Sequence, residues 1–360
     1  MRSTGTIKTL IVDDSPLVRS ILTRVLDGVK DIEVVGGAKD PYEAREMIIN
    51  YRPDVILLDI EMPRMDGITF LRKLMEHYPV PVIMCSSVAP HNSRNALEAI
   101  EIGAVDVVAK PTAGGSSALR QLAEDLTEKI RAAAVAMPSR PRINIPQTSD
   151  PVSFCAAGLD PAKYLVAIGA STGGTEAIRA VLQNVPPDFP PVVMVQHMPE
   201  GFTQSFAERL NGLSVLQVTE AVDGDILVPG RAFLARGNIQ MRVVNRAGQW
   251  RISYGSSEPV NRHCPSVDVL FDSVAAQIGA RAVGVLLTGM GADGARGLLN
   301  MRQAGAYTVA QNQASCVVYG MPKVAVDLGA VQQQCSPPEV ARIVLQALRT
   351  KPKARIPAKV

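Results

Sequence analysis

The chain has 360 residues, of which 47% are hydrophobic and 20% are charged, enough apolar material for two folded domains. Its formal net charge of +3 is small for this length, so charge does not indicate a nucleic-acid or membrane partner. The five cysteines are widely spaced and form no metal-type pairs, and we see no signal-like or membrane-length apolar run. We therefore expect a cytoplasmic protein with reduced thiols and no direct membrane insertion.

Short apolar segments alternate with helical patterns through the first third of the chain. Continuously apolar strands separated by helices are typical of a parallel sheet covered on both faces. The pattern therefore predicts an α/β domain that ends with a helix near 119–136. The expected strands cover residues 7–12, 32–36, 55–58, 80–84 and 105–108.

Polar side chains follow these strands at the points where the strands end. The carboxyl ends of parallel strands meet at one edge of a sheet, so we expect these side chains to lie close together. Three carboxylates at such an edge repel one another unless a divalent cation neutralises them, and hard oxygen ligands suit Mg²⁺. Single aspartates are common after strands, but a set of three with a lysine indicates a site. The residues are Asp13, Asp14, Asp59, Ser86 and Lys110.

These residues, with the stretch LDIEMPRMDG at 58–67 and Lys110-Pro111, resemble the receiver domain of two-component response regulators over about residues 5–130. The resemblance implies a flavodoxin-like fold in which Asp59 accepts a phosphoryl group from a histidine kinase. It also implies that Lys110 pairs with the acyl phosphate and that Ser86 switches with it. The implied Mg²⁺ ligands are Asp13, Asp14, Asp59 and the Glu61 carbonyl.

The predicted domain boundaries follow from a loss of periodicity after the last helix of the first half. Repeated prolines interrupt residues 133–161, which we predict to be a linker between a receiver domain at 1–132 and a second domain at 162–350. Residues 351–360 form a basic tail to which we assign no role. The second domain is predicted to be doubly wound, mainly parallel α/β, with an antiparallel ribbon within 214–254.

A nucleophile is predicted in the second domain. The apolar run 164–169 enters the Gly-x-Ser-x-Gly pattern at 169–173, and a helical pattern follows. A serine on such a turn presents its hydroxyl at the carboxyl end of the sheet, beside the amides of a helix N-terminus. His197 and Asp293 also follow predicted strands, as expected for a general base and the acid that orients it. Ser171 is the predicted nucleophile.

The chain order Ser, His, Asp differs from that of the α/β-hydrolases. The segments at 169–175, 196–198, 262–268 and 287–294 instead resemble the methylesterase domain of the chemotaxis regulator CheB, over about residues 162–348. The resemblance implies hydrolysis of glutamate methyl esters on methyl-accepting chemoreceptors, with methanol released and no cofactor in this domain. It implies an oxyanion donor at the Met290 amide, aided by Thr172 or the amides after Ser171. Deamidation of receptor glutamines follows from the same acyl chemistry.

Other interpretations are possible at this stage. A DNA-binding output domain would show a basic recognition helix, which the second half lacks, and a general esterase or peptidase would have no reason to carry a receiver. Arg262 and His263 are interpreted as shape or substrate-side residues rather than as chemical groups. We expect a monomer whose partners are chemoreceptors and a chemotaxis histidine kinase. We also hypothesise that the unphosphorylated receiver covers Ser171.

Overall fold

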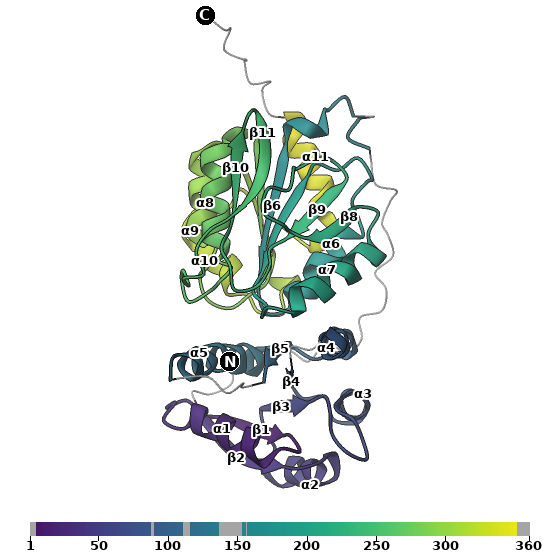
Figure 1. Cartoon of the computed structure of the whole chain (residues 1–360), viewed down its shortest axis with the longest axis vertical. Coiled ribbons are helices and arrows are strands. Elements are labelled where there is room, and N and C mark those ends of the chain that lie inside the picture. The colour runs from purple at the N-terminus through teal and green to yellow at the C-terminus, as the bar shows by residue number, and fades with distance from the viewer. Residues whose placement is uncertain (1–4, 88–89, 111–115, 137–152, 156, 351–360) are drawn as a thin grey trace, which may run out of the picture.

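Two parallel sheets organise the chain in the computed structural model, which describes residues 5–87, 90–110, 116–136, 153–155 and 157–350. Each sheet lies in its own domain, and the two domains are stacked along the long axis of the molecule (Figure 1). The predicted basic tail, Pro111 and most of the predicted linker lie outside the described residues.

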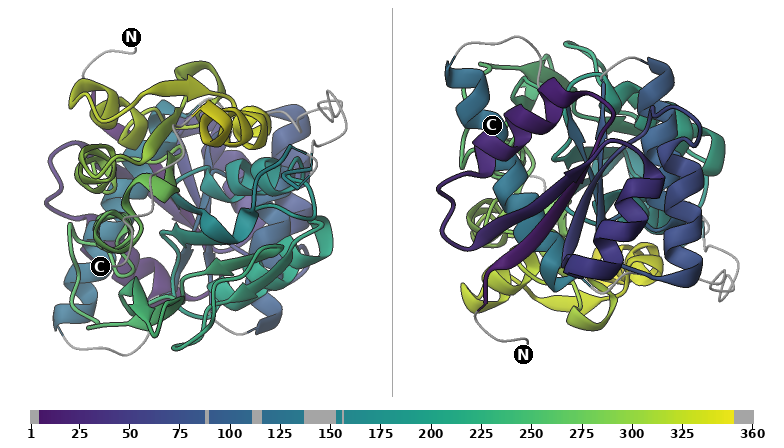
Figure 2. Two further views of the ribbon diagram at one scale, coloured as in Figure 1. Left: turned by 90° about the horizontal axis from the view of Figure 1, so that it is seen from above. Right: turned by 90° about the horizontal axis from the view of Figure 1, so that it is seen from below.

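The first domain has a five-stranded sheet in the order β2-β1-β3-β4-β5, with every neighbouring pair parallel. This is the strand order of the flavodoxin-like fold, as expected. Helices flank the sheet (Figure 2). The strands are β1 (Ile7–Val12), β2 (Ile32–Ala38), β3 (Val55–Asp59), β4 (Val82–Ser86) and β5 (Asp106–Ala109). The helices are α1 (Pro16–Leu26), α2 (Pro41–Tyr51), α3 (Gly67–His77), α4 (Pro90–Ile102) and α5 (Ser116–Val135).

The second domain has a seven-stranded parallel sheet in the order β14-β13-β12-β6-β7-β9-β8. Its strands are β6 (Leu165–Ala170), β7 (Val192–Gln196), β8 (Gln217–Glu220), β9 (Arg231–Leu234), β12 (Ala282–Leu286), β13 (Tyr307–Gln311) and β14 (Gln333–Cys335). Its helices are α6 (Gly174–Leu182), α7 (Phe202–Leu213), α8 (Val267–Gln277), α9 (Ala295–Gln303), α10 (Met321–Asp327) and α11 (Val340–Thr350).

The strand order of this sheet reverses between β6 and β12. From β6 the chain moves to one side of the sheet through β7, β8 and β9, and it returns to the other side at β12. The loops that leave β6 and β12 therefore start side by side at the carboxyl edge of the sheet. Such a switch point is where open α/β sheets bind ligands.

The predicted antiparallel ribbon is present within 214–254, at the end of that range. Among the described strands of this range, β10 (Met241–Arg246) and β11 (Gln249–Tyr254) form the antiparallel pair, and an isolated antiparallel bridge joins Ile226 to Arg251. β8 and β9 instead join the main sheet in parallel. Residues 232–234 of β9 are fully buried, as a strand covered on both faces requires. β10 instead alternates buried Met241 and Val243 with exposed Arg242, as in a hairpin covered on one face.

The end of the predicted linker packs against the second domain. Phe154 is fully buried, and its ring meets that of Phe189 edge to face at a centroid distance of 5.2 Å. Asp188 fixes the same segment, because its Oδ2 accepts from the Ser153 hydroxyl at 2.6 Å and from the Cys155 amide at 2.7 Å. Among the described residues, no helix is both long and apolar enough to cross a membrane.

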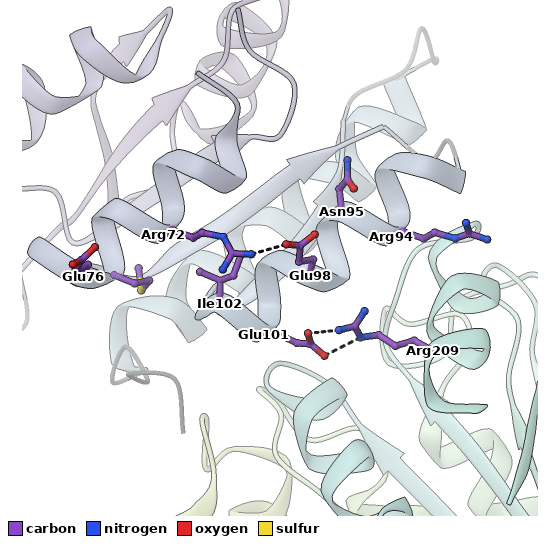
Figure 3. A pocket seen from close by; sticks show the side chains of 9 residues that line it. Arg72, Glu76, Arg94, Asn95, Glu98, Glu101, Ile102 and Arg209 are labelled. Atoms are coloured by element: carbon purple, nitrogen blue, oxygen red, sulfur yellow. Dashed lines mark hydrogen bonds and ion pairs between the residues drawn. The ribbon is translucent and has the colours of Figure 1, made fainter. Parts of the chain in front are cut away.

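Helices α4 and α5 of the first domain face the second domain (Figure 1). Arg209 of α7 pairs with Glu101 of α4, and Glu208 pairs with Arg94 at 3.3 Å. Arg94, Glu101 and Arg209 line a groove of about 780 Å³ between α3, α4 and α7 (Figure 3), whose lining includes none of the predicted catalytic residues. The domains are therefore held together partly by charged pairs at an open edge.

We expect Phe154→Ala to destabilise the second domain by about 3 kcal/mol, because it removes a fully buried aromatic side chain. Urea unfolding followed by the fluorescence of Trp250, the one tryptophan of the chain, measures this loss. Val215→Ala, at a side chain that is 62% exposed, serves as the control and should change stability by less than about 0.5 kcal/mol. Equal stability of the two variants would contradict docking of this segment.

Candidate active site

Three neighbouring strands deliver the three predicted catalytic residues to one edge of the sheet. In the β6–β7 register Ala170 lies opposite Gln196, so Ser171 and His197 are the next residues on adjacent strands. β12 pairs with β6 on the other side, and the loop after it carries Asp293. All three side chains are buried, with Ser171 only 7% exposed. The structure thus brings together the residues that the sequence pattern selected.

The turn that carries Ser171 is fixed by backbone contacts. Its amide donates to the Thr288 carbonyl at 3.0 Å, and its own carbonyl accepts from the Gly174 amide at 2.7 Å and from Gln196 Nε2 at 2.9 Å. A side chain at position 289 is excluded, because a Cβ there would lie 2.7 Å from the Ser171 Cβ. The glycine therefore lets the loop after β12 approach Ser171 closely.

One ring nitrogen of His197 is bonded and the other is buried without a partner. Nε2 lies 2.9 Å from Asp293 Oδ2, and Nδ1 has no hydrogen-bond partner among the described residues. Because a carboxylate accepts, Nε2 carries the proton that is donated to Asp293, which leaves the Nδ1 lone pair open. An imidazole in this tautomer can accept a proton from a neighbouring hydroxyl.

Asp293 is a buried carboxylate that receives hydrogen bonds on both oxygens. Burial alone would raise its pKa, but the hydrogen bond and charge of His197, with further donors, hold the pKa of Asp293 below its ordinary value. The carboxylate is therefore ionised and fixed. The other donors are the Asn261 amide group (2.8 Å), the Ser266 hydroxyl (2.7 Å) and the backbone amides of Val267 (2.6 Å) and Asp268 (3.3 Å).

The two predicted oxyanion donors differ in their surroundings. Met290 follows Gly289 in the loop after β12, and within the described part of the chain its amide makes no hydrogen bond. The Thr172 hydroxyl instead donates to Asp106 Oδ2 of the first domain at 2.8 Å. In this arrangement that hydroxyl is engaged, so only the Thr172 amide is left to serve an oxyanion. Both roles stay predictions.

The first domain covers the site through β5 and α5. Asp106, at the start of β5, is buried, and its second oxygen lies 3.5 Å from the Nζ of buried Lys129 on α5. Glu128, one residue earlier on α5, has its carboxylate 3.9 Å from His263 Nε2. Burial raises the pKa of Glu128, and the charge of His197 opposes that shift. Charged groups of the first domain thus contact Thr172 and His263, which lie beside Ser171 and His197.

Three contacts in this site were not predicted from the sequence. Asn261 and Ser266 bond to Asp293, and His263 lies with its ring against that of His197 at a centroid distance of 3.7 Å. Residues 262–268 stood out as a motif, but no spacing rule connects them to a carboxylate near position 293. Only the folded chain identifies them as neighbours of the triad.

The predicted phosphorylation site forms at the carboxyl edge of the first sheet. Carboxylate oxygens of Asp13, Asp14 and Asp59 lie within 4.8 Å of one another, and Lys110 Nζ lies 2.9 Å from Asp13 and 2.8 Å from Asp59. Asp13 and Asp59 are buried, whereas Asp14 is exposed. Burial raises the pKa of Asp59 to about 6, and the hydrogen bond from Lys110 opposes that shift. This hard-oxygen set, with one side open to solvent, fits Mg²⁺.

The two other predicted residues of the first domain lie at or just after the ends of its strands. Ser86 ends β4 and is buried, and its hydroxyl donates to the Ser87 carbonyl at 3.1 Å. Glu61 follows β3, and its amide donates to Asp59 Oδ1 at 3.3 Å. The switch role of Ser86 and the metal-ligand role of the Glu61 carbonyl stay predictions.

Comparison with known proteins covers both domains. Residues 9–123 match the response regulator receiver domain family, and residues 166–344 match the CheB methylesterase family. A protein-glutamate methylesterase/protein-glutamine glutaminase of Paraburkholderia xenovorans is 49% identical over 358 residues, which cover 95% of this chain and 96% of the relative. One of Salmonella typhi is 47% identical over 350 residues, which cover 97% of this chain and 99% of the relative.

A solved structure agrees with the second domain. The methylesterase catalytic domain of Thermotoga maritima CheB is 34% identical, with a TM-score of 0.50, and the match covers 51% of this chain and 97% of that domain. A DNA-binding output domain is therefore excluded as an interpretation of the second half. Both family matches and the full-length relatives lead to one conclusion: the chain belongs to the CheB methylesterase family of enzymes, with a response regulator receiver domain ahead of the catalytic domain.

Proposed function

We propose that this enzyme hydrolyses glutamate methyl esters on the cytoplasmic helices of methyl-accepting chemoreceptors, through a triad of Ser171, His197 and Asp293. The observation that carries the proposal is the His197 ring, bonded to Asp293 at one nitrogen and open at the other beside the Ser171 turn. The names of the relatives support the substrate class, and also deamidation of receptor glutamines. Chemotaxis adaptation is the process such a reaction would serve.

The chemistry follows from the proton positions. His197 Nδ1 takes the proton of the Ser171 hydroxyl as its oxygen attacks the ester carbonyl, while Asp293 stabilises the imidazolium that forms. The Met290 amide would donate to the oxyanion. His197 then gives the proton to the leaving methoxide, so methanol departs and an acyl-enzyme remains. Water, deprotonated by His197, attacks the acyl carbon, and the Ser171 oxygen leaves and takes the proton back from His197, which releases the glutamate product. A glutamine substrate would lose ammonia by the same steps.

Phosphorylation is proposed to control access to Ser171. A histidine kinase would supply the phosphoryl group to Asp59, with Lys110 on the acyl phosphate and Ser86 following it. Mg²⁺, held by Asp13, Asp14, Asp59 and the Glu61 carbonyl, would offset the charge of the incoming phosphoryl group. The carboxylate cluster supports this proposal, because it suits a hard divalent cation.

Without phosphorylation the receiver is proposed to block the catalytic pocket. Supporting this, the hydroxyl of Thr172, the residue after the proposed nucleophile, donates a hydrogen bond to Asp106, and α4 pairs with α7 through Glu101 and Arg209. We also propose a monomer in the cytoplasm. Five free cysteines suit a reducing compartment.

Ser171→Ala tests the proposed nucleophile. We expect methanol release from methylated receptor membranes to fall by at least about 10⁴-fold, because no acyl-enzyme can form. Ser257→Ala, at an exposed serine of the same domain, should release methanol at the rate of the unmodified chain. Unchanged release by Ser171→Ala would contradict the mechanism.

Charge reversal tests the closed arrangement. Glu101→Arg or Arg209→Glu alone should raise basal methanol release about two- to fivefold, since an exposed ion pair contributes about 0.5 to 1 kcal/mol. The double variant should return toward the basal rate, because the pair is restored with opposite polarity. Arg342→Glu on α11, which breaks the exposed pair with Glu339, is the control. Additive effects in the double variant would exclude this contact as part of the closure.

Asp59→Asn tests the strained carboxylate cluster. The raised pKa of Asp59 means that the folded chain binds more protons than the unfolded chain between about pH 4 and 6, so ionised Asp59 opposes folding above this window. In EDTA at pH 7.5 the variant should be more stable by about 2 kcal/mol, and the gain should vanish toward pH 4. Calorimetric unfolding at several pH values measures it. Added Mg²⁺ should shrink the gain at pH 7.5; a gain independent of pH would contradict the assignment.

A further inference from the structure

A tight turn at residues 260–263 has an unusual backbone. Val260 and His263 exchange two backbone hydrogen bonds of 2.9 Å, and the two residues between them are both left-handed, with φ of 52° at Asn261 and 72° at Arg262. This is the geometry of a type I′ turn, which favours asparagine and glycine and disfavours arginine. Backbone in such sparsely populated regions persists where surrounding contacts fix it, and it clusters at functional sites.

The first of these contacts is made by Asn261. Its amide nitrogen donates to Asp293 Oδ1 at 2.8 Å and to Asp268 Oδ2 at 2.7 Å, so one neutral group bridges two carboxylates. Asp268 is itself fixed, because its Oδ1 accepts from the Gly297 amide at 2.6 Å. Burial raises the pKa of Asp268, and the charge of Asp293 raises it further. The Asn261 amide thus sets the distance between two acids that would otherwise repel.

The second contact is made by His263. Its ring lies nearly parallel to that of His197, with centroids 3.7 Å apart and planes 12° apart. Gln240, fully buried, holds the backbone of the turn, since its Nε2 donates to the carbonyls of His263 and Glu258 at 3.0 Å each. Burial, together with the charge of His197, lowers the pKa of His263 to about 3, so the ring is neutral at physiological pH. A flat, neutral ring can fix the plane of its neighbour without adding charge.

We propose that the 260–263 turn is a positioning element for the catalytic pair, in which Asn261 orients Asp293 and His263 orients His197. Neither residue reaches the reacting atoms; each acts through the triad member that it contacts. This role rests on the proposed triad. The single turn contacts both partners of the His197–Asp293 hydrogen bond. Asn261 bonds to the Asp293 carboxylate, and the His263 ring stacks on the His197 ring.

The test compares full-length variants with an acyl-phosphate donor present, on methylated receptor membranes. Asn261→Gly keeps the left-handed backbone and removes the amide group, and His263→Ala removes the ring. Each should lower kcat about ten- to a hundredfold with little change in KM, because misplacing a catalytic group by about 1 Å costs a factor near 10². His263→Phe, which restores a flat neutral ring, should recover most of the loss.

A spectroscopic measurement separates positioning from general loss of structure. The His197 Nε2 proton, hydrogen-bonded to Asp293, should give a low-field proton NMR signal that exchanges slowly with water. We expect Asn261→Gly and His263→Ala to speed this exchange, and His263→Phe to leave it slow. Ala247→Gly is the matched control, since it makes the same kind of change in the left-handed turn between β10 and β11.

Two results would overturn the proposal. One is a kcat within twofold of the unmodified chain for Asn261→Gly and His263→Ala, together with an unchanged exchange rate. The other is a His263→Phe variant as slow as His263→Ala, which would exclude the ring stack as the cause. These results are distinct from failure of the proposed function: if Ser171→Ala is active, the nucleophile is wrong and the turn has no triad to position.

Discussion

The buried carboxylate of Asp293 is the group on which the catalytic domain's organisation depends. A carboxylate that is 2% exposed is stable as an anion only if donors surround it, and here the donors come from three separate segments. His197 follows β7, the start of α8 supplies backbone amides, and the 260–263 turn supplies a side-chain amide. Satisfying this one charge therefore fixes the relative positions of the segments that surround His197 and Asp293.

The same principle links the two domains. Asp106 of the receiver is buried, and its partners are the Thr172 hydroxyl of the catalytic domain and Lys129 of its own α5. Opening the interface would leave Asp106 without the Thr172 bond but would expose it to water, so the cost of opening is modest. An interface of this kind suits the proposed release of the receiver on phosphorylation.

The periodicity of the chain was sufficient to predict the first sheet, the central strands of the second sheet and the three residues at the strand ends. Ser171, His197 and Asp293 each follow a continuously apolar run, and parallel strands necessarily bring such positions to one edge. The antiparallel ribbon within 214–254 is present, but the sequence did not assign β8 and β9 to the main sheet, because short strands look alike until their partners are known. β9 pairs in parallel with both of its neighbours and is buried on both faces. The four residues of this strand do not by themselves indicate that burial.

By itself the sequence determined which functional residues follow the predicted strands, and in what order along the chain: a carboxylate cluster first, then a serine turn, a histidine and an aspartate. These patterns are local, since each depends on residues a few positions apart. Only the tertiary structure decided that Asn261 meets Asp293, that His263 lies on His197, and that Asp106 meets Thr172. Those contacts join residues 32, 66 and 66 positions apart, and such distances close only when helices and strands pack, so no local spacing encodes them.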